Sequence, residues 1–115
     1  MNSIPPRRGE VWLVDFQPGR GSEQQGLRPA LVIQNDVGNR YSATTIVAAI
    51  TSTIKIYPMT VPLKPGEGGL RRRSMINLSR LFTVDMSRLR QRLGVLPEPR
   101  IEMENGAIKV SLDVA

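Results

Sequence analysis

Residues 27–51 read LRPALVIQNDVGNRYSATTIVAAIT. Two apolar runs, 30–34 and 44–51, stand on either side of a polar connection. The β-branched residues in both runs predict strands. The second run is apolar at successive positions, which is typical of a strand that is buried on both faces. This stretch therefore predicts a β-rich core built around two neighbouring strands.

The register of these two strands brings two polar residues together. If the strands pair antiparallel, with the connection centred between Asn39 and Arg40, Arg28 lies opposite Thr51. Directly opposed residues have Cβ atoms about 4.5–5.5 Å apart. A cation and a hydroxyl would then meet at the open end of the sheet. There are two plainer alternatives. Arg28 could be a surface arginine without a function, and Thr51 could belong to an ordinary polar segment at the end of a strand.

Turn-forming residues divide the rest of the chain into short elements. Asp36 and Asp85 are placed to cap short helical turns. Three glycines between positions 19 and 26 make the stretch before the first of the two strands a loop. No linker or repeat divides the chain, so we expect one domain over 1–115. The other expected elements are a strand over 11–16, an edge strand over 58–63, a turn over 64–69 followed by the arginines 71–73, and a strand over 74–84.

The C-terminal sequence carries two conflicting signals. Asn105 and Gly106, between two segments of alternating character, are typical of a hairpin turn. A helix would gather Ile101, Ile108 and Leu112 on one side, which is a weaker pattern. Local signals alone therefore favour a hairpin.

Composition limits the chemistry that the chain can perform. It has no histidine and no cysteine, which excludes disulfides, thiolate zinc sites and histidine-based proton transfer. Sixteen basic residues against ten acidic ones give a net charge of +6. This balance suits a polyanionic partner such as nucleic acid, although a solvated basic surface has the same composition. The sequence shows no signal peptide and no membrane-spanning run, so we expect a cytoplasmic protein without membrane contact.

A series of short motifs runs through the chain in a fixed order. They are Arg8-Gly9-Glu10-Val11-Trp12, Gly21-Ser22-Glu23-Gln24 with Gly26 and Arg28-Pro29, Leu31-Val32-Ile33-Gln34-Asn35-Asp36, Gly38-Asn39-Arg40, and Ala48-Ala49-Ile50-Thr51. In these motifs the sequence resembles the MazF/PemK family of toxin–antitoxin endoribonucleases, including its Bacillus-type members. The resemblance covers nearly the whole chain.

The resemblance implies a mainly β fold with short helices. The implied fold is an SH3-like barrel with the PemK/MazF/CcdB-type antiparallel twisted sheet and a C-terminal helix. The C-terminal segment is therefore expected to be helical, in spite of its local hairpin signal. Gly106 inside that helix would cost about 1 kcal/mol relative to alanine. The resemblance also implies a cytoplasmic homodimer that is held by a MazE-like acidic antitoxin.

The activity implied by the resemblance is that of an mRNA interferase, a metal-independent endoribonuclease without a cofactor. The catalytic arginine of the family falls on Arg28 and its catalytic threonine on Thr51. In family members the ribose 2′-OH of single-stranded RNA attacks the adjacent phosphorus and leaves a 2′,3′-cyclic phosphate and a 5′-OH. A guanidinium that holds two phosphate oxygens stabilises the charge of this transition state, so Arg28 is assigned to that role. Glu23 is expected to be a supporting residue that braces Arg28 or holds the loop, and the acceptor of the 2′-OH proton, Glu23 or water, stays open.

The RNA sequence would be read by polar side chains around this pair, because sequence-specific proteins mostly read RNA in single-stranded form. Arg80 stands where we expect a glutamine in the Bacillus-type members, and Phe82 replaces a basic residue. The cleavage motif of those members is therefore not carried over. The predicted RNA-binding residues are Ser22, Gln24, Ser52, Thr53, Lys55 and Arg80.

Two other functions remain open at this point. A gyrase poison, as in the related CcdB toxins, would bind a protein and perform no chemistry of its own. Such a poison needs neither the pair of Arg28 and Thr51 nor the glycine-rich loop. An RNA-binding module that has lost catalysis is compatible with the same residues.

Overall fold

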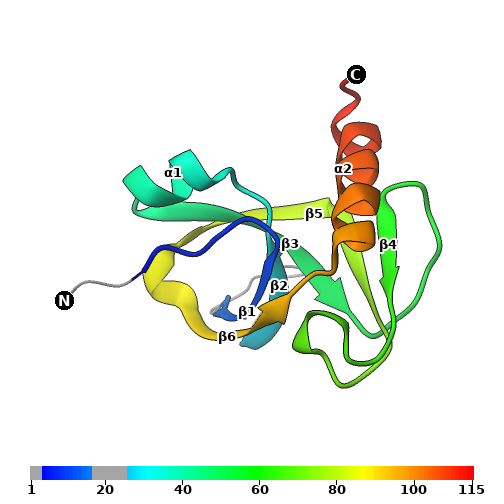
Figure 1. Ribbon diagram of the computed structural model, residues 1–115, viewed down its shortest axis with the longest axis horizontal. Coiled ribbons are helices and arrows are strands. Elements are labelled where there is room, and N and C mark those ends of the chain that lie inside the picture. The colour runs from blue at the N-terminus through cyan, green and yellow to red at the C-terminus, as the bar shows by residue number, and fades with distance from the viewer. Residues whose placement is uncertain (1–3, 17–25) are drawn as a thin grey trace.

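The computed structural model describes residues 4–16 and 26–115, so the glycine-rich stretch 17–25 lies outside the described residues. Within the described residues, six strands form one antiparallel sheet in the order β4-β5-β3-β2-β1-β6 (Figure 1). The strands are β1 (Glu10–Asp15), β2 (Leu27–Val32), β3 (Thr44–Thr51), β4 (Thr60–Leu63), β5 (Ser74–Asp85) and β6 (Leu89–Val95). The helices are α1 (Asp36–Tyr41) and α2 (Glu98–Leu112), with 3₁₀ turns η1 (Glu67–Gly69) and η2 (Met86–Arg88).

The two central strands, β2 and β3, pair in the register that the sequence predicts. Ala30 lies opposite Ala49, and Val32 lies opposite Val47, with no offset between them. β3 is buried on both faces, because Ile50 belongs to the larger apolar cluster and Val47 to the smaller one. A slip of one residue would exchange these faces. Since each buried aliphatic side chain contributes about 1.5–3 kcal/mol, the register is strongly fixed.

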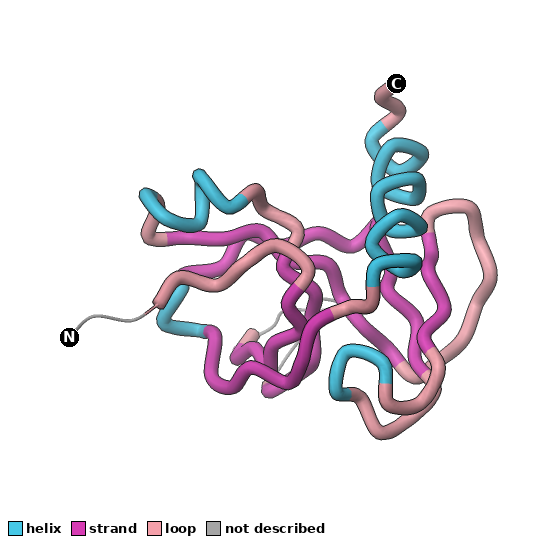
Figure 2. Tube along the Cα trace, viewed as in Figure 1, coloured by secondary structure: helices cyan, strands magenta, loops and turns pink. Residues whose placement is uncertain are grey.

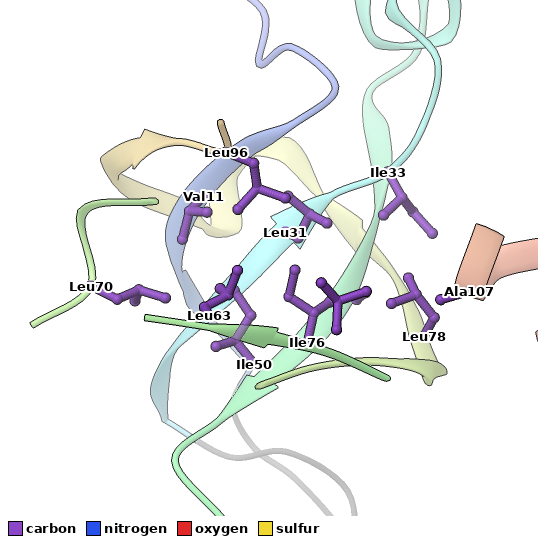
Figure 3. Close-up of a cluster of buried hydrophobic side chains, with 12 residues drawn as sticks. Val11, Leu31, Ile33, Ile50, Leu63, Leu70, Ile76, Leu78, Leu96 and Ala107 are labelled. Carbon is purple, nitrogen blue, oxygen red and sulfur yellow. The ribbon is translucent and has the colours of Figure 1, made fainter. Parts of the chain in front are cut away.

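The larger apolar cluster fills the inside of the curved sheet (Figure 3). It consists of Val11, Leu31, Ile33, Ala48, Ile50, Val61, Leu63, Leu70, Ile76, Leu78, Leu96 and Ala107. The smaller cluster consists of Val14, Ala30, Val32 and Val47, against which partly buried side chains of β1, β5 and β6 pack. The two clusters lie on opposite faces of the central strands and together account for their apolar residues at successive positions.

The sheet closes towards a barrel where its two ends meet. β4 and β6 are the edge strands, and the η1 turn that follows β4 packs against β6. Gly69 has a φ of 77°, and a Cβ built there would lie 1.9 Å from the carbonyl oxygen of Leu93. Only glycine combines a positive φ with so close an approach of two backbones. Figure 2 shows the resulting curvature, with α1 and α2 well separated on the molecule.

The C-terminal segment is a helix, so the expectation from the family resemblance is confirmed and the hairpin interpretation is wrong. α2 packs against β4 and β5 (Figure 1). Its buried residues are Ala107 and Glu104, and the Arg8 guanidinium donates to the Glu104 carboxylate over 3.0 Å. A charged residue at a core position weakens the apolar pattern of the helix, which explains why the local sequence favoured a hairpin. No helix in the described part of the chain is long and apolar enough to span a membrane.

The caps of the short helical turns partly differ from the prediction. Asn35, not Asp36, caps α1, because its side chain accepts a hydrogen bond of 2.7 Å from a backbone N–H of the first turn. The Asp36 carboxylate instead accepts from the Arg8 N–H over 2.7 Å and ties the N-terminal segment to α1. Asp85 caps η2 as predicted, by accepting from a backbone N–H over 2.9 Å.

Candidate active site

The pairing of β2 with β3 leads Arg28 and Thr51 to the same end of the sheet. The strand ladder runs as far as the pair of Ala30 and Ala49, and two further steps along the strands reach Arg28 and Thr51. Arg28 is the second residue of β2, and its backbone also pairs with Val14 of β1. Thr51 is the last residue of β3. Both backbones therefore belong to strands, and not to the loops that follow them.

A neighbouring backbone group orients the Thr51 hydroxyl. The Thr53 N–H donates to Thr51 Oγ1 over 3.1 Å. A hydroxyl has two acceptor lone pairs and one hydrogen. Since this contact uses a lone pair, the Thr51 O–H remains able to donate to a ligand.

Two cavities include both Arg28 and Thr51 in their walls. The larger cavity has a volume of about 410 Å³ and is lined by Arg28, Pro29, Ile50, Thr51, Ser52, Thr53, Leu70, Arg71, Arg72 and Ser74. The smaller cavity, of about 220 Å³, is lined by Arg28, Ala49, Ile50, Thr51, Thr53, Lys55, Met75, Asn77 and Arg80. A separate cavity of about 640 Å³ lies beside α1 and η2, but Arg40 is its one basic side chain among the described residues. We therefore take the two cavities around Arg28 and Thr51 as the candidate site.

The structure gathers the described members of the predicted RNA-binding set around this pair. Ser52 and Thr53 line the larger cavity, and Lys55 and Arg80 line the smaller one. The Lys55 backbone is held by a hydrogen bond of 3.3 Å from its N–H to the Met75 sulfur. Ser22, Glu23 and Gln24 lie outside the described residues.

An irregularity in β5 forms part of the smaller cavity. Leu81 pairs with Ala48, whereas the next position of β3, Ala49, pairs with Asn77, so three residues of β5 are left over between the two pairs. Asn77 Oδ1 accepts from both the backbone N–H and the hydroxyl of Ser79, over 3.0 and 2.6 Å. Bulges of this kind often lie beside active sites, where they redirect a side chain. Here the bulge brings Asn77 and Arg80 into the same cavity wall.

The walls of both cavities are basic. They include Arg28, Lys55, Arg71, Arg72 and Arg80, and no carboxylate among the described lining residues. Basic clefts of this kind concentrate anions, and a guanidinium matches the oxygens of a phosphate. The arrangement can therefore bind a phosphodiester and stabilise extra negative charge on it.

Sequence reasoning missed several lining residues. It identified the run of arginines 71–73 but gave it no place in the site. It also gave no role to Ser74 or Asn77, for which the sequence carries no special signal. The run of adjacent arginines was a usable signal for the first group, because clustered basic residues are typical of surfaces that bind nucleic acid.

Comparison with known proteins shows the class to which this fold and site belong. Residues 7–112 match the family of PemK-like, MazF-like toxins of type II toxin–antitoxin systems. The chain belongs to this toxin family. The family resemblance of the sequence is thereby confirmed.

A curated relative and two solved structures support this assignment. The chain is 45% identical over 109 residues to the Endoribonuclease MazF of Staphylococcus saprophyticus, which covers 92% of this chain and 90% of that protein. The crystal structure of MazF from Deinococcus radiodurans is 26% identical, with a TM-score of 0.82 over 97% of this chain and 100% of that chain. A mycobacterial endoribonuclease in complex with its cognate antitoxin is 24% identical and has the same fold, with a TM-score of 0.82 over 96% and 97% of the two chains. The predicted fold, mainly β with a C-terminal helix, is confirmed.

Proposed function

We propose that the chain is the toxin of a type II toxin–antitoxin system and cuts single-stranded RNA at a phosphate held by Arg28 and Thr51. The observation that carries this proposal is that both residues line the same two basic cavities. The 45% identical relative is named an endoribonuclease, which supports the same activity here. We place the reaction in the cytoplasm, where messenger RNA is translated.

The proposed reaction needs no metal, because the RNA supplies its own nucleophile. The 2′-oxygen forms a bond to the adjacent phosphorus while the bond from phosphorus to the 5′-oxygen breaks. The 2′-OH loses its proton and the 5′-oxygen gains one, so the products are a 2′,3′-cyclic phosphate and a 5′-OH. Arg28 donates two N–H groups to the phosphate oxygens, whose negative charge grows in the transition state. The Thr51 hydroxyl donates to the same phosphate or orients the 2′-OH.

The function is tested by incubating the pure protein in EDTA with a long single-stranded RNA and mapping the 5′ ends of the fragments. We expect cleavage at a short recurring motif. Loss of one preorganised donor to a developing oxyanion lowers turnover by about 10²–10³-fold, so Arg28→Ala and Thr51→Ala are expected to lose activity on this scale. Arg40→Ala, an exposed change on α1, serves as the matched control and is expected to cleave normally.

The competing functions are separated when gyrase supercoiling and RNA binding are measured with the same protein. Absence of RNA cleavage together with inhibition of gyrase supercoiling would identify a protein-binding poison. RNA binding without cleavage would identify an inactive RNA-binding module. Either result contradicts the proposal.

We also propose that the chain acts as a homodimer and that a cognate, MazE-like acidic antitoxin inhibits it. A solved mycobacterial relative is in complex with its cognate antitoxin. The basic cavities around Arg28 and Thr51 offer complementary charge to an acidic segment. Competition for these cavities would explain inhibition without any change in the toxin's fold.

A further inference from the structure

The run of arginines 71–73 lies where η1 leads into β5, far in sequence from Arg28 and Thr51. Arg71 and Arg72 nevertheless line the 410 Å³ cavity together with that pair. Arg73, the third member of the run, is not among the residues that line it. The run therefore contributes two of its three cations to the wall of the proposed active site.

The segment that carries these arginines is anchored on both sides. Leu70 is 8% exposed and belongs to the larger apolar cluster, where Figure 3 shows it directed towards Leu63. After the run, the Ser74 hydroxyl donates to the Arg72 carbonyl oxygen over 3.0 Å. Before it, the Leu70 N–H donates to the Glu67 carbonyl oxygen over 3.2 Å. Arg71 and Arg72 thus extend from a backbone that is fixed relative to β3.

These arginines differ from most others in the described chain, because none of the described carboxylates pairs with them. Arg8, Arg88, Arg90, Arg92 and Arg100 each form an ion pair with Asp or Glu over 3.0–4.0 Å. Among the described residues, no carboxylate lies within this distance of residues 71–73, all of which are exposed. The nearby Glu67 already accepts from the Lys64 N–H and pairs with Arg100, contacts that lower its pKa.

An unpaired cluster of like charges in a fixed segment costs free energy, which a bound polyanion would offset. A strand of RNA supplies a negative charge at every nucleotide. If one phosphate lies on Arg28 and Thr51, a neighbouring phosphate of the same strand enters the cavity that Arg71 and Arg72 line. The guanidinium groups can bind its oxygens in the bidentate manner typical of arginine.

We propose that Arg71 and Arg72 form a second phosphate subsite, which binds the phosphate next to the one that is cleaved. This inference rests on the proposed endoribonuclease function. The two arginines hold the strand in both the ground state and the transition state, so they affect KM more than kcat. They are positioning residues, and the reacting phosphate belongs to Arg28 and Thr51.

The first test compares R71Q/R72Q with R73Q, which removes a charge from the same run outside the cavity wall. The substrate is a short RNA with one mapped cleavage site. We expect R71Q/R72Q to raise KM by about tenfold or more with a small change in kcat. Each phosphate that is no longer neutralised on single-stranded nucleic acid lowers the salt slope of binding by about 0.7, so loss of this one subsite lowers it by about 0.7. An effect of R73Q equal to that of the double variant overturns the subsite.

The second test neutralises the phosphate instead of the protein. A methylphosphonate replaces, in turn, the phosphate on either side of the cleaved one. At one of these positions we expect KM of the unchanged protein to rise, and KM of R71Q/R72Q to change little further, because the contact is already lost. Additive effects at both positions overturn the proposal. So does an unchanged KM of the unchanged protein at both positions, a result that does not depend on the folding of any variant.

The outcomes separate this inference from the function on which it rests. If the unchanged protein cuts no RNA, the endoribonuclease proposal fails together with the subsite. If it cuts RNA and R71Q/R72Q has an unchanged KM and salt slope, the subsite alone fails. A variant that loses affinity for an acidic antitoxin segment, while its KM for RNA is unchanged, identifies a protein-binding site and also overturns the proposal.

Discussion

At the scale of single residues, two glycines occupy opposite kinds of position. Gly106 is exposed inside α2, and a Cβ built there meets no atom within 4 Å. Gly69 has a φ of 77° and lies against the backbone of Leu93. No steric constraint therefore requires a glycine at position 106. A side chain at position 69, in contrast, would force the backbone to move.

Replacement of Gly106 by alanine is expected to stabilise the protein. Gly106→Ala should raise the free energy of unfolding by about 1 kcal/mol, because alanine loses less backbone entropy in a helix. Urea unfolding followed by circular dichroism measures this difference. Gly69→Ala is the contrasting variant and should strongly destabilise the protein. A destabilised Gly106→Ala protein would contradict the helical C-terminus.

The residues that form the proposed active site differ in how far the sequence identifies them. Arg28 and Thr51 could be paired from the lengths of two strands and their connection, because antiparallel register follows a simple count. Arg71 and Arg72 could not be placed in the same way. Their position depends on how η1 packs against β6, a long-range contact that leaves no periodic pattern in the sequence.

At the scale of secondary-structure elements, α2 depends on an unusual buried contact. Glu104 is fully buried, and the Arg8 guanidinium lies 3.0 Å from its Oε2. Its other oxygen has no hydrogen-bond partner among the residues that the structure describes. Burial raises the pKa of Glu104 above its ordinary value near 4.5, although Arg8 partly opposes this shift. Protonation of this carboxyl therefore favours the docked helix.

This shift has a definite consequence for stability as a function of pH. A carboxyl whose pKa is higher in the folded than in the unfolded state makes the folded protein bind a proton first as the pH falls. The free energy of unfolding of the unchanged protein, relative to that of Glu104→Gln, should therefore rise as the pH falls through the raised pKa towards 4.5. This gain is complete below 4.5 and is lost at higher pH.

Urea unfolding of both proteins between pH 4 and pH 8 (roughly the range where such carboxyls titrate) measures the difference. Glu102→Gln, an exposed change on the same helix, controls for the loss of one negative charge. A relative loss of stability as the pH falls would instead mean that the ion pair with Arg8 dominates over burial.

The elements that local sequence pattern alone failed to predict share one physical reason. β6 carries exposed polar residues over 90–92, because it is an edge strand, so its apolar alternation is weak. α2 places Glu104 and the small Ala107 against the barrel, so its apolar stripe is weak as well. β2 and β3 were predictable because they lie in the middle of the sheet, where burial demands a continuous apolar sequence. The apolar pattern of a segment therefore predicts its secondary structure only where its neighbours bury it evenly, as in the middle of the sheet.

At the scale of the whole molecule, the net charge of +6 attracts RNA and an acidic protein segment by the same electrostatic force. RNA and an acidic antitoxin segment should therefore compete for the same cavities. We expect a short acidic amphipathic peptide to raise the apparent KM for RNA without changing kcat, with an effect that weakens as salt increases. Steady-state cleavage at several peptide concentrations tests this expectation. A fall in kcat at unchanged KM, or full activity of the peptide-saturated protein, would rule out a shared site.

The position of Arg28 and Thr51 on strands has a consequence for the history of such proteins. The pairing of β2 with β3 in the middle of the sheet sets the spacing of Arg28 and Thr51. The other cavity walls are formed by short segments around 52–55 and 70–74 and by the bulge in β5. The exposed side chains of such segments tolerate exchange far better than the buried side chains of central strands do. A lineage built on this plan can therefore diversify the RNA sequences that it cuts, or change its antitoxin, while it keeps the same reaction.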